Sequence, residues 1–301
     1  MKSVLITGTS RGIGLETALA FGRAGYTVHA TMRKPVQSPR LRETAAEQNL
    51  PIHVTAMDVD SDESVRVTIA AIEAKHGPID VLVNNAGTEV HGHIEEVPLA
   101  QFRAVMETNY FGALRCIQAV LGQMRQRRSG CIVNVSSVAG RLASAPLTPY
   151  MASKWALEAL SEGLAGEMKT FGVRVAIVEP GIIDTGMARQ IEEQPGTSPY
   201  RQHARFSGLF AASLKDAVPP SVVADKIVEI VQSGTWQLRH PVGPSAAPFL
   251  EWRKSMTDEQ WVDLNASDDE TWYTRIQQDF GMDTRPEAVG RGTDREAAAA
   301  V

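Results

Sequence analysis

The sequence is poor in the features that would assign it to several large classes of protein. It has only two cysteines, Cys116 and Cys131, so we expect no disulfide framework and interpret both as buried free thiols. No run of about eighteen apolar residues occurs, and the apolar start at residues 3–7 is too short for a signal peptide. The net charge of -5 lacks the basic excess of nucleic-acid and membrane-surface binders. The sequence therefore predicts a cytoplasmic protein with neither nucleic acid nor membrane as a partner.

Clusters of metal ligands are also scarce. His91 and His93 alternate with neighbouring Glu95 and Glu96 in a way that could form a site, but no structural zinc spacing occurs. We interpret these four as solvated loop residues and predict no metal.

What the sequence does contain is a regular alternation of short β-branched runs with longer helical patterns. This alternation is typical of an α/β fold of the Rossmann type, a doubly wound parallel sheet with helices on both faces. About seven strands are predicted, at residues 3–7, 27–31, 52–57, 81–83, 131–136, 173–179 and 236–239. The main helices are predicted at residues 13–25, 62–76, 99–128 and 148–171.

The pattern changes near residue 240. Residues 240–244 read HPVGP, which we expect to break any regular element, and large aromatic residues follow in short helical patterns. We predict a dinucleotide-binding and catalytic domain at 1–240, a helical C-terminal extension at 241–284 and a flexible tail at 285–301. Residues 186–214 mix apolar side chains with polar ones and are predicted to form a substrate lid.

A glycine-rich turn joins the first predicted strand to the first predicted helix. Residues 7–14 read TGTSRGIG, and such a turn lets the backbone approach a pyrophosphate at a helix N-terminus. The spacing differs from GxGxxG, so the turn alone is weak evidence, because an ordinary tight turn also needs glycines.

The end of the second predicted strand bears on the choice of cofactor. An NAD site usually has an acidic residue there, whereas this chain has Thr31 and Met32 followed by Arg33, with Arg11 in the glycine turn. These arginines could be solvated surface residues. Because a guanidinium suits a 2′-phosphate, we predict that NADP(H) is preferred over NAD(H).

Six motifs, taken in order, resemble those of the short-chain dehydrogenase/reductase family. They are TGTSRGIG at 7–14, NNAG at 84–87, Asn109, Ser137, Tyr150 with Lys154 in YMASK, and Pro180-Gly181. A YxxxK pair alone arises often by chance, but the ordered set is specific and covers about residues 3–240. Arg33 and the long C-terminal part are similar to the 17β-hydroxysteroid dehydrogenase-like and carbonyl reductase branch.

The catalytic residues follow from this resemblance and from the spacing. Tyr150 and Lys154 are four apart, so they share one helix face, and we expect the ammonium to lower the pKa of the phenol. Tyr150 would then transfer a proton to or from the substrate. The resemblance implies that Ser137 binds the substrate oxygen, Lys154 also binds the nicotinamide ribose, and Asn109 holds a water in a proton relay.

The resemblance also implies a cofactor cleft and a substrate pocket. In the cleft, Asp58 and Val59 would contact adenine and Thr185 the nicotinamide amide. The predicted cofactor residues are Gly8, Ser10, Arg11, Gly12, Ile13, Gly14, Arg33, Asp58, Val59, Asn85, Ala86, Gly87, Tyr150, Lys154, Pro180, Gly181, Ile183 and Thr185. The predicted substrate residues are Val90, Val138, Leu142, Ala143, Met187 and Phe206.

Together these features predict an NADP(H)-dependent oxidoreductase that interconverts a hydrophobic ketone or aldehyde with its alcohol. Two alternatives stay open, a dehydratase or epimerase on the same fold and a non-catalytic NADP(H)-sensing or scaffold protein. The intact Asn-Ser-Tyr-Lys set favours redox chemistry over both. Since family members pair through helices corresponding to residues 99–128 and 148–171, we also predict a homodimer or homotetramer, for which the repeat of Ala156, Leu157, Leu160 and Leu164 would supply apolar surface.

Overall fold

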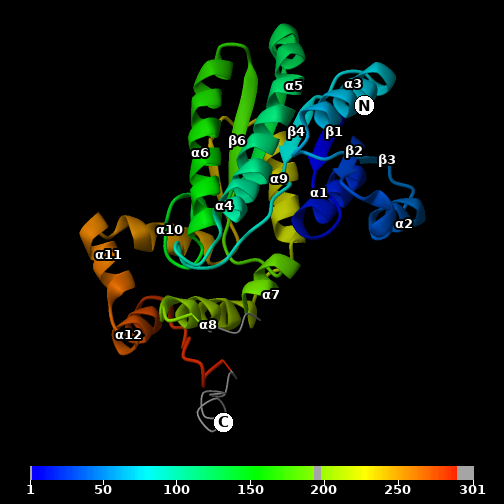
Figure 1. Ribbon diagram of the computed structural model, residues 1–301. Helices are drawn as coiled ribbons and strands as arrows, with labels where there is room; N and C mark the ends of the chain where they lie inside the picture. The colour runs from blue at the N-terminus through cyan, green and yellow to red at the C-terminus, as the bar shows by residue number, and fades with distance from the viewer. Residues whose placement is uncertain (1, 193–197, 290–301) are drawn as a thin grey trace.

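The computed structural model describes residues 2–192 and 198–289, and these form a seven-stranded parallel sheet covered by helices (Figure 1). The strand order is β3-β2-β1-β4-β5-β6-β7, with every neighbouring pair parallel. The strands are β1 (Ser3–Thr7), β2 (Thr27–Met32), β3 (Ile52–Ala56), β4 (Val81–Asn84), β5 (Gly130–Val135), β6 (Val173–Pro180) and β7 (Arg239–Val242). The predicted doubly wound sheet is confirmed. The central strands β1 and β4 are buried on both faces, which explains their continuous apolar sequences.

Two hydrophobic cores lie on opposite faces of this sheet. On one face, Val4 and Ile6 of β1 pack with α1 (Gly12–Arg23), α2 (Arg40–Glu47) and α9 (Ser221–Ser233). On the other face, Leu5 packs with α3 (Asp62–His76), α5 (Gly112–Arg127) and α6 (Thr148–Lys169). Alternate residues of one strand therefore serve alternate layers, as the two-residue period of a strand requires.

The long helix predicted at 99–128 is interrupted. Its first part is α4 (Leu99–Met106), and a π-helical turn at Glu107–Phe111 separates it from α5. Such single π-turns occur frequently at functional sites. Here the turn carries Asn109, whose side chain is buried.

The seventh strand also differs from expectation. The prediction placed it at 236–239 and expected 240–244 to break regular structure, whereas β7 runs over Arg239–Val242 and includes Pro241. The prediction was wrong because proline is excluded only from central strands, and β7 is an edge strand paired on one side with β6.

The remaining helices gather at one end of the sheet, below it in Figure 1. They are α7 (Gly186–Glu192), α8 (Gln202–Leu214), α10 (Ala246–Lys254), α11 (Asp258–Ala266) and α12 (Asp269–Phe280). Residues 193–197 of the predicted lid and 290–301 of the predicted tail lie outside the described residues. Arg285 forms ion pairs with Glu270 and Asp283, so the described start of the tail is bound to the extension. None of the helices described here is both long and apolar enough to cross a membrane.

Candidate active site

The glycine turn forms a cradle at the start of α1. A Cβ added at Gly14 would lie 2.3 Å from the carbonyl oxygen of Gly8 and 2.4 Å from Nδ2 of Asn85, so only glycine fits. Arg11 occupies the N-cap of α1 and makes no side-chain capping hydrogen bond. The N–H groups of the first helical turn are thus available to an anion, and this cradle fits a pyrophosphate.

The NNAG segment is tied to this turn by hydrogen bonds. Asn85 Nδ2 donates to the carbonyl oxygens of Thr7 and Gly8, at 2.9 and 3.1 Å. Thr7 Oγ1 accepts from the backbone N–H groups of Asn85 and Ala86, each at 3.0 Å. Sequence reasoning did not assign Thr7 a role, yet its hydroxyl joins the two motifs.

One cavity of about 490 Å³ lies along the carboxyl ends of the strands. All eighteen residues predicted to contact the cofactor line it, together with Ser137 and Met187. Residues that the sequence had not indicated line it too, among them Thr88, Glu89 and Ser136. The residues predicted to bind the dinucleotide therefore lie along a single cleft.

The two arginines predicted at the 2′-phosphate have different surroundings. Arg33 follows β2 and is exposed. Nη1 of Arg11 would lie 3.9 Å from a Cβ added at Gly186, so this guanidinium lies near the start of α7. Arg33 is the cation at the end of β2, whereas Arg11 faces the opposite wall of the cleft.

Tyr150 and Ser137 meet in this cleft. Ser137 ends the β5 segment and caps the short 3-10 helix Val138–Gly140, and its hydroxyl accepts from the N–H of Ala139 at 3.1 Å. Burial raises the pKa of Tyr150, the charge of Glu89 raises it further, and a hydrogen bond with Ser137 opposes the rise. Tyr150 therefore retains its proton, the form required of a general acid.

The expectation that Lys154 lowers the pKa of Tyr150 is wrong for this structure. Lys154 Nζ lies 5.5 Å from the centre of the Tyr150 ring and donates instead to the carbonyl oxygen of Val135 at 2.9 Å. Burial of the phenol outweighs any effect of this ammonium. Burial also lowers the pKa of Lys154 itself to about 8, although Glu158 opposes the shift.

Asn109 holds the loop after β4 by three hydrogen bonds. Its Oδ1 accepts from the N–H of Thr88 at 2.8 Å, and its Nδ2 donates to the Thr88 carbonyl at 2.9 Å and to Ser153 Oγ at 2.8 Å. A Cβ added at Gly87 would lie 3.4 Å from Asn109 Oδ1 and 3.8 Å from Lys154 Nζ. The structure therefore brings Asn109 and Lys154 close to the same glycine, and the role of Asn109 in a proton relay stays a prediction.

A second, apolar cavity of about 90 Å³ opens beyond Ser137. We call it the aromatic chamber, because Phe206 and Phe210 of α8 and three tryptophans of the extension line it, Trp252, Trp261 and Trp272. The tryptophans show that the extension contributes directly to the site, a role that their clustering in the sequence could have indicated.

The predicted substrate residues are divided between the two cavities. Val138, Leu142 and Phe206 line the aromatic chamber, and Met187 lines the cofactor cleft. Val90 and Ala143 are absent from both sets of lining residues, and the carbonyl of Ala143 instead accepts from Trp261 Nε1 at 2.7 Å.

The interpretation of His91, His93, Glu95 and Glu96 as solvated loop residues is wrong for the two histidines, whereas both glutamates are exposed. The side chains of His91 and His93 are each only 6% exposed. His91 Nε2 lies 3.6 Å from Glu89 Oε2, whereas His93 Nδ1 pairs with Glu96 Oε2 at 3.0 Å and its ring stacks on Tyr200. Histidines after a strand can be buried by segments distant in sequence, and here Ser198 and Tyr200 contact His93.

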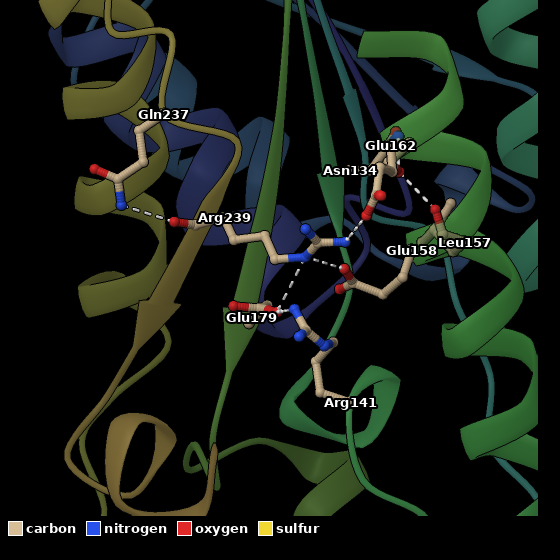
Figure 2. A network of polar contacts seen from close by, with 9 residues as sticks. Asn134, Arg141, Leu157, Glu158, Glu162, Glu179, Gln237 and Arg239 are labelled. Carbon is tan, nitrogen blue, oxygen red and sulfur yellow. Dashed lines mark hydrogen bonds and ion pairs between the residues drawn. The ribbon is translucent and has the colours of Figure 1, made fainter. Parts of the chain in front are cut away.

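A polar network joins α6, the helix that carries Tyr150 and Lys154, to β6 and β7 (Figure 2). Arg239 of β7 pairs with Glu158 and Glu162 of α6, through Nε at 2.9 Å and Nη2 at 2.6 Å. Glu179 of β6 is 1% exposed and lies 3.7 Å from Arg141 and 3.9 Å from Arg239. Its burial and the charge of Glu158 raise the pKa of Glu179 to about 7.

Comparison with known proteins agrees with this geometry. Residues 2–196 match the short chain dehydrogenase family. The chain is 37% identical to retinol dehydrogenase 8 of Bos taurus, over 83% of this chain and 84% of the relative. It is 32% identical to estradiol 17-beta-dehydrogenase 1 of Rattus norvegicus, over 95% of this chain and 89% of the relative. A solved structure of an actinorhodin polyketide ketoreductase with NADPH is similar at a TM-score of 0.73 and 28% identity, covering 81% of this chain and 97% of that one.

The chain belongs to the short-chain dehydrogenase family. As a short-chain dehydrogenase it is an oxidoreductase, and the match to the rat relative extends over almost the whole chain, so the helical extension is part of the alignment.

Proposed function

We propose that this short-chain dehydrogenase is an NADP(H)-dependent enzyme that interconverts a ketone or aldehyde with its alcohol. The observation that carries the proposal is the meeting of Ser137, Tyr150 and Lys154 in the same cleft as the glycine cradle. Proton transfer and cofactor groups are thus within one cavity, as hydride transfer to a carbonyl requires.

Ser137, Tyr150 and Lys154 would have different roles in the reduction of a carbonyl. A nicotinamide bound along the cleft would supply the hydride, and Ser137 would donate a hydrogen bond to the carbonyl oxygen as negative charge develops there. Tyr150 would donate its proton to that oxygen. Lys154, held by the carbonyl of Val135, would return a proton toward Tyr150, and Asn109 would hold a water that links Lys154 to solvent. The oxidation of an alcohol follows the same steps in reverse.

The cofactor preference rests on the end of β2. None of the residues at positions 31–33 is acidic, so no carboxylate at the end of β2 repels a 2′-phosphate. Arg33 would offer a guanidinium to bind it. The ketoreductase of similar fold contains NADPH, which agrees with this preference.

The aromatic chamber favours an apolar substrate. Its lining beyond Ser137 consists mainly of aliphatic and aromatic side chains, and two relatives are named for retinol and estradiol. A cavity of about 90 Å³ is smaller than the roughly 300 Å³ of a typical small-molecule site. We therefore expect α8, which forms part of the lid, to move outward when a large substrate binds.

Two other classes of function remain as alternatives, the dehydratase or epimerase and the non-catalytic NADP(H)-sensing protein. A panel of ketones of graded size, with NADPH absorbance as the readout, tests all three. Consumption of one NADPH per alcohol formed supports the reductase. Product without net NADPH consumption supports the dehydratase or epimerase, and NADPH binding without any product supports the sensor.

We also propose assembly through α5 and α6, although not through the residues first expected. Leu157 and Leu164 are buried in this chain's own core, and Leu160 packs against it. The outer surface instead exposes Phe111, the last residue of the π-helical turn before α5, and Trp155 on α6, at 42% and 47%. A dimer or tetramer would cover them. The two free, buried cysteines agree with the cytoplasm as the compartment.

A further inference from the structure

A buried carboxylate lies next to the catalytic tyrosine and has no role in the reaction described above. Glu89 follows the NNAG segment and lines the same cavity as Tyr150 and Ser137. Its side chain is only 8% exposed, and its charge acts on Tyr150. The catalytic site therefore contains an ionisable group that sequence reasoning did not indicate.

The partners of Glu89 in the described chain only partly offset its burial, which raises the pKa of its carboxyl although His91 and the charge of Arg11 oppose the rise. Its Oε2 is 3.6 Å from His91 Nε2, beyond good hydrogen-bonding distance, and its Oε1 is buried without a hydrogen-bond partner. His91 Nε2 likewise lacks a hydrogen bond. Burying an incompletely paired carboxylate costs several kcal/mol, which is unexpected where packing alone is needed. Such groups in clefts are candidates for ligand recognition.

The chemistry of reduction indicates what would bind there. Hydride transfer places negative charge on the carbonyl oxygen near Tyr150, and the negative charge that Glu89 carries when ionised opposes it. A hydrogen-bond donor on the substrate would partner Glu89 and reduce this repulsion. A carboxylate accepts hydrogen bonds and donates none when ionised, so the matching group is a hydroxyl or an amine.

We propose that Glu89, oriented by His91, recognises a hydroxyl or amino group that the substrate carries close to its reacting carbonyl. This inference rests on the proposed carbonyl reductase function and narrows its substrate class. The substrate then has two parts, an apolar part in the aromatic chamber and a donor beside the carbonyl at Glu89. Glu89 is a specificity-determining residue, and His91 is a positioning residue that acts through it.

Three matched ketones test the proposal, namely a methyl ketone and the hydroxymethyl and aminomethyl ketones with the same apolar chain. Wild-type enzyme should show kcat/KM at least about tenfold higher for one of the two donor-bearing ketones than for the methyl ketone, the low end for a hydrogen bond to a charged group. Glu89→Gln should remove most of an aminomethyl preference, because an ammonium loses its charged partner, and this loss identifies the donor as an ammonium. It should lower a hydroxymethyl preference by less, because an amide oxygen still accepts from a hydroxyl, and Glu89→Leu, which accepts no hydrogen bond, should then remove that preference. Each preference is measured as the ratio of kcat/KM to that of the methyl ketone in the same variant.

Two further variants complete the experiment. Glu47→Gln, an exposed substitution on α2, is the matched control and should leave all three rates unchanged. His91→Gln should weaken the preference less than Glu89→Gln does, with thermal melting confirming that each variant is folded.

The outcomes separate this inference from the function on which it rests. Equal turnover of the three ketones, unchanged by Glu89→Gln, would contradict the inference alone. A changed ratio of NADP⁺ to NADPH affinity in Glu89→Gln, with unchanged substrate preference, would assign Glu89 to the cofactor and also overturn it. If no ketone is reduced by any form of the enzyme, the proposed function and the inference both fail.

Discussion

The cofactor cleft and the aromatic chamber share Ser137 but are built in different ways. The cleft uses backbone groups and glycines from segments that end parallel strands, above all β1 and β4. The chamber uses large side chains from α8 and the extension, which approach the sheet from elsewhere in the chain. Under the proposed function, cofactor binding would depend mainly on main-chain geometry fixed by the sheet, whereas the apolar part of the substrate would be selected by side chains of separate helices.

The largest effect is expected at Tyr150, which lines the cofactor cleft together with the shared Ser137. Tyr150→Phe should lower reductase kcat by at least about a hundredfold, the low end for removal of a general acid, while the affinity for NADPH changes little. Steady-state rates and a fluorescence titration of NADPH measure the two effects. Tyr273→Phe, which removes the hydroxyl of a buried tyrosine in the extension, is the control and should retain near-normal rates. A loss of only a few-fold in Tyr150→Phe would remove Tyr150 from its assigned role.

A substitution confined to the cofactor cleft should alter only the preference between NADPH and NADH. NADPH should be preferred over NADH by at least about tenfold, and Arg33→Asp should reverse most of that preference, because a carboxylate repels the 2′-phosphate. The ratio of kcat/KM values for the two cofactors measures it. The exposed Arg42→Asp on α2 is the control. If the wild-type protein uses NADH equally well, the prediction is wrong.

The pH dependence of the rate tests Lys154, which lines the cofactor cleft. The pKa of Lys154 is lowered to about 8, so its ammonium is lost above that pH. Reductase kcat/KM should then fall by about tenfold per pH unit above 8. Lys154→Arg stays charged throughout and should remove this alkaline limb, even if its overall rate is lower. A wild-type profile that is flat to pH 10 would show that the charge of Lys154 is not required.

The smallest expected effect concerns the network behind the site and is a change of stability. Because the pKa of Glu179 is raised to about 7 in the folded protein, the folded state binds a proton that the unfolded state releases near its usual value. Protonated Glu179 therefore contributes to the free energy of unfolding at low pH, and this contribution is lost as the pH rises from about 4.5 to 7. Glu179→Gln carries no such charge, so its melting temperature relative to wild type should rise between pH 5 and pH 8, by roughly 1.6 °C per kcal/mol for a chain of 301 residues.

Glu162 gives the matched comparison within the same network. Its pKa is lowered by Arg239, so the sign is reversed, and Glu162→Gln should lose stability relative to wild type as the pH rises. Parallel shifts in both variants would contradict the assignment of Glu179 as a raised carboxyl.

The contrast between the two halves also explains what the sequence could predict. Local patterns determine a glycine turn, a strand end and a YxxxK helix, so Gly14, Tyr150 and the order of elements were predictable. The exact place of β7 was not, because the tolerance for Pro241 depends on that strand lying at an edge. The raised pKa of Tyr150 and the burial of Glu89 depend on contacts between distant segments. Neither contact has a local signature in the sequence.

Pro241 has a further consequence, for the solubility of the protein. The carbonyl of Leu238 accepts a hydrogen bond from Ile177 of β6, and that of Val242 accepts from Gly181, directly after β6. Alternation along β7 therefore turns the backbone of Pro241 toward the free edge. At that position the edge offers no N–H with which another chain could extend the sheet. Exposed edges are templates for aggregation, and proline is one of the devices that blunt them. Pro241→Val is accordingly expected to increase aggregation at high concentration, by opening the sheet to a foreign strand.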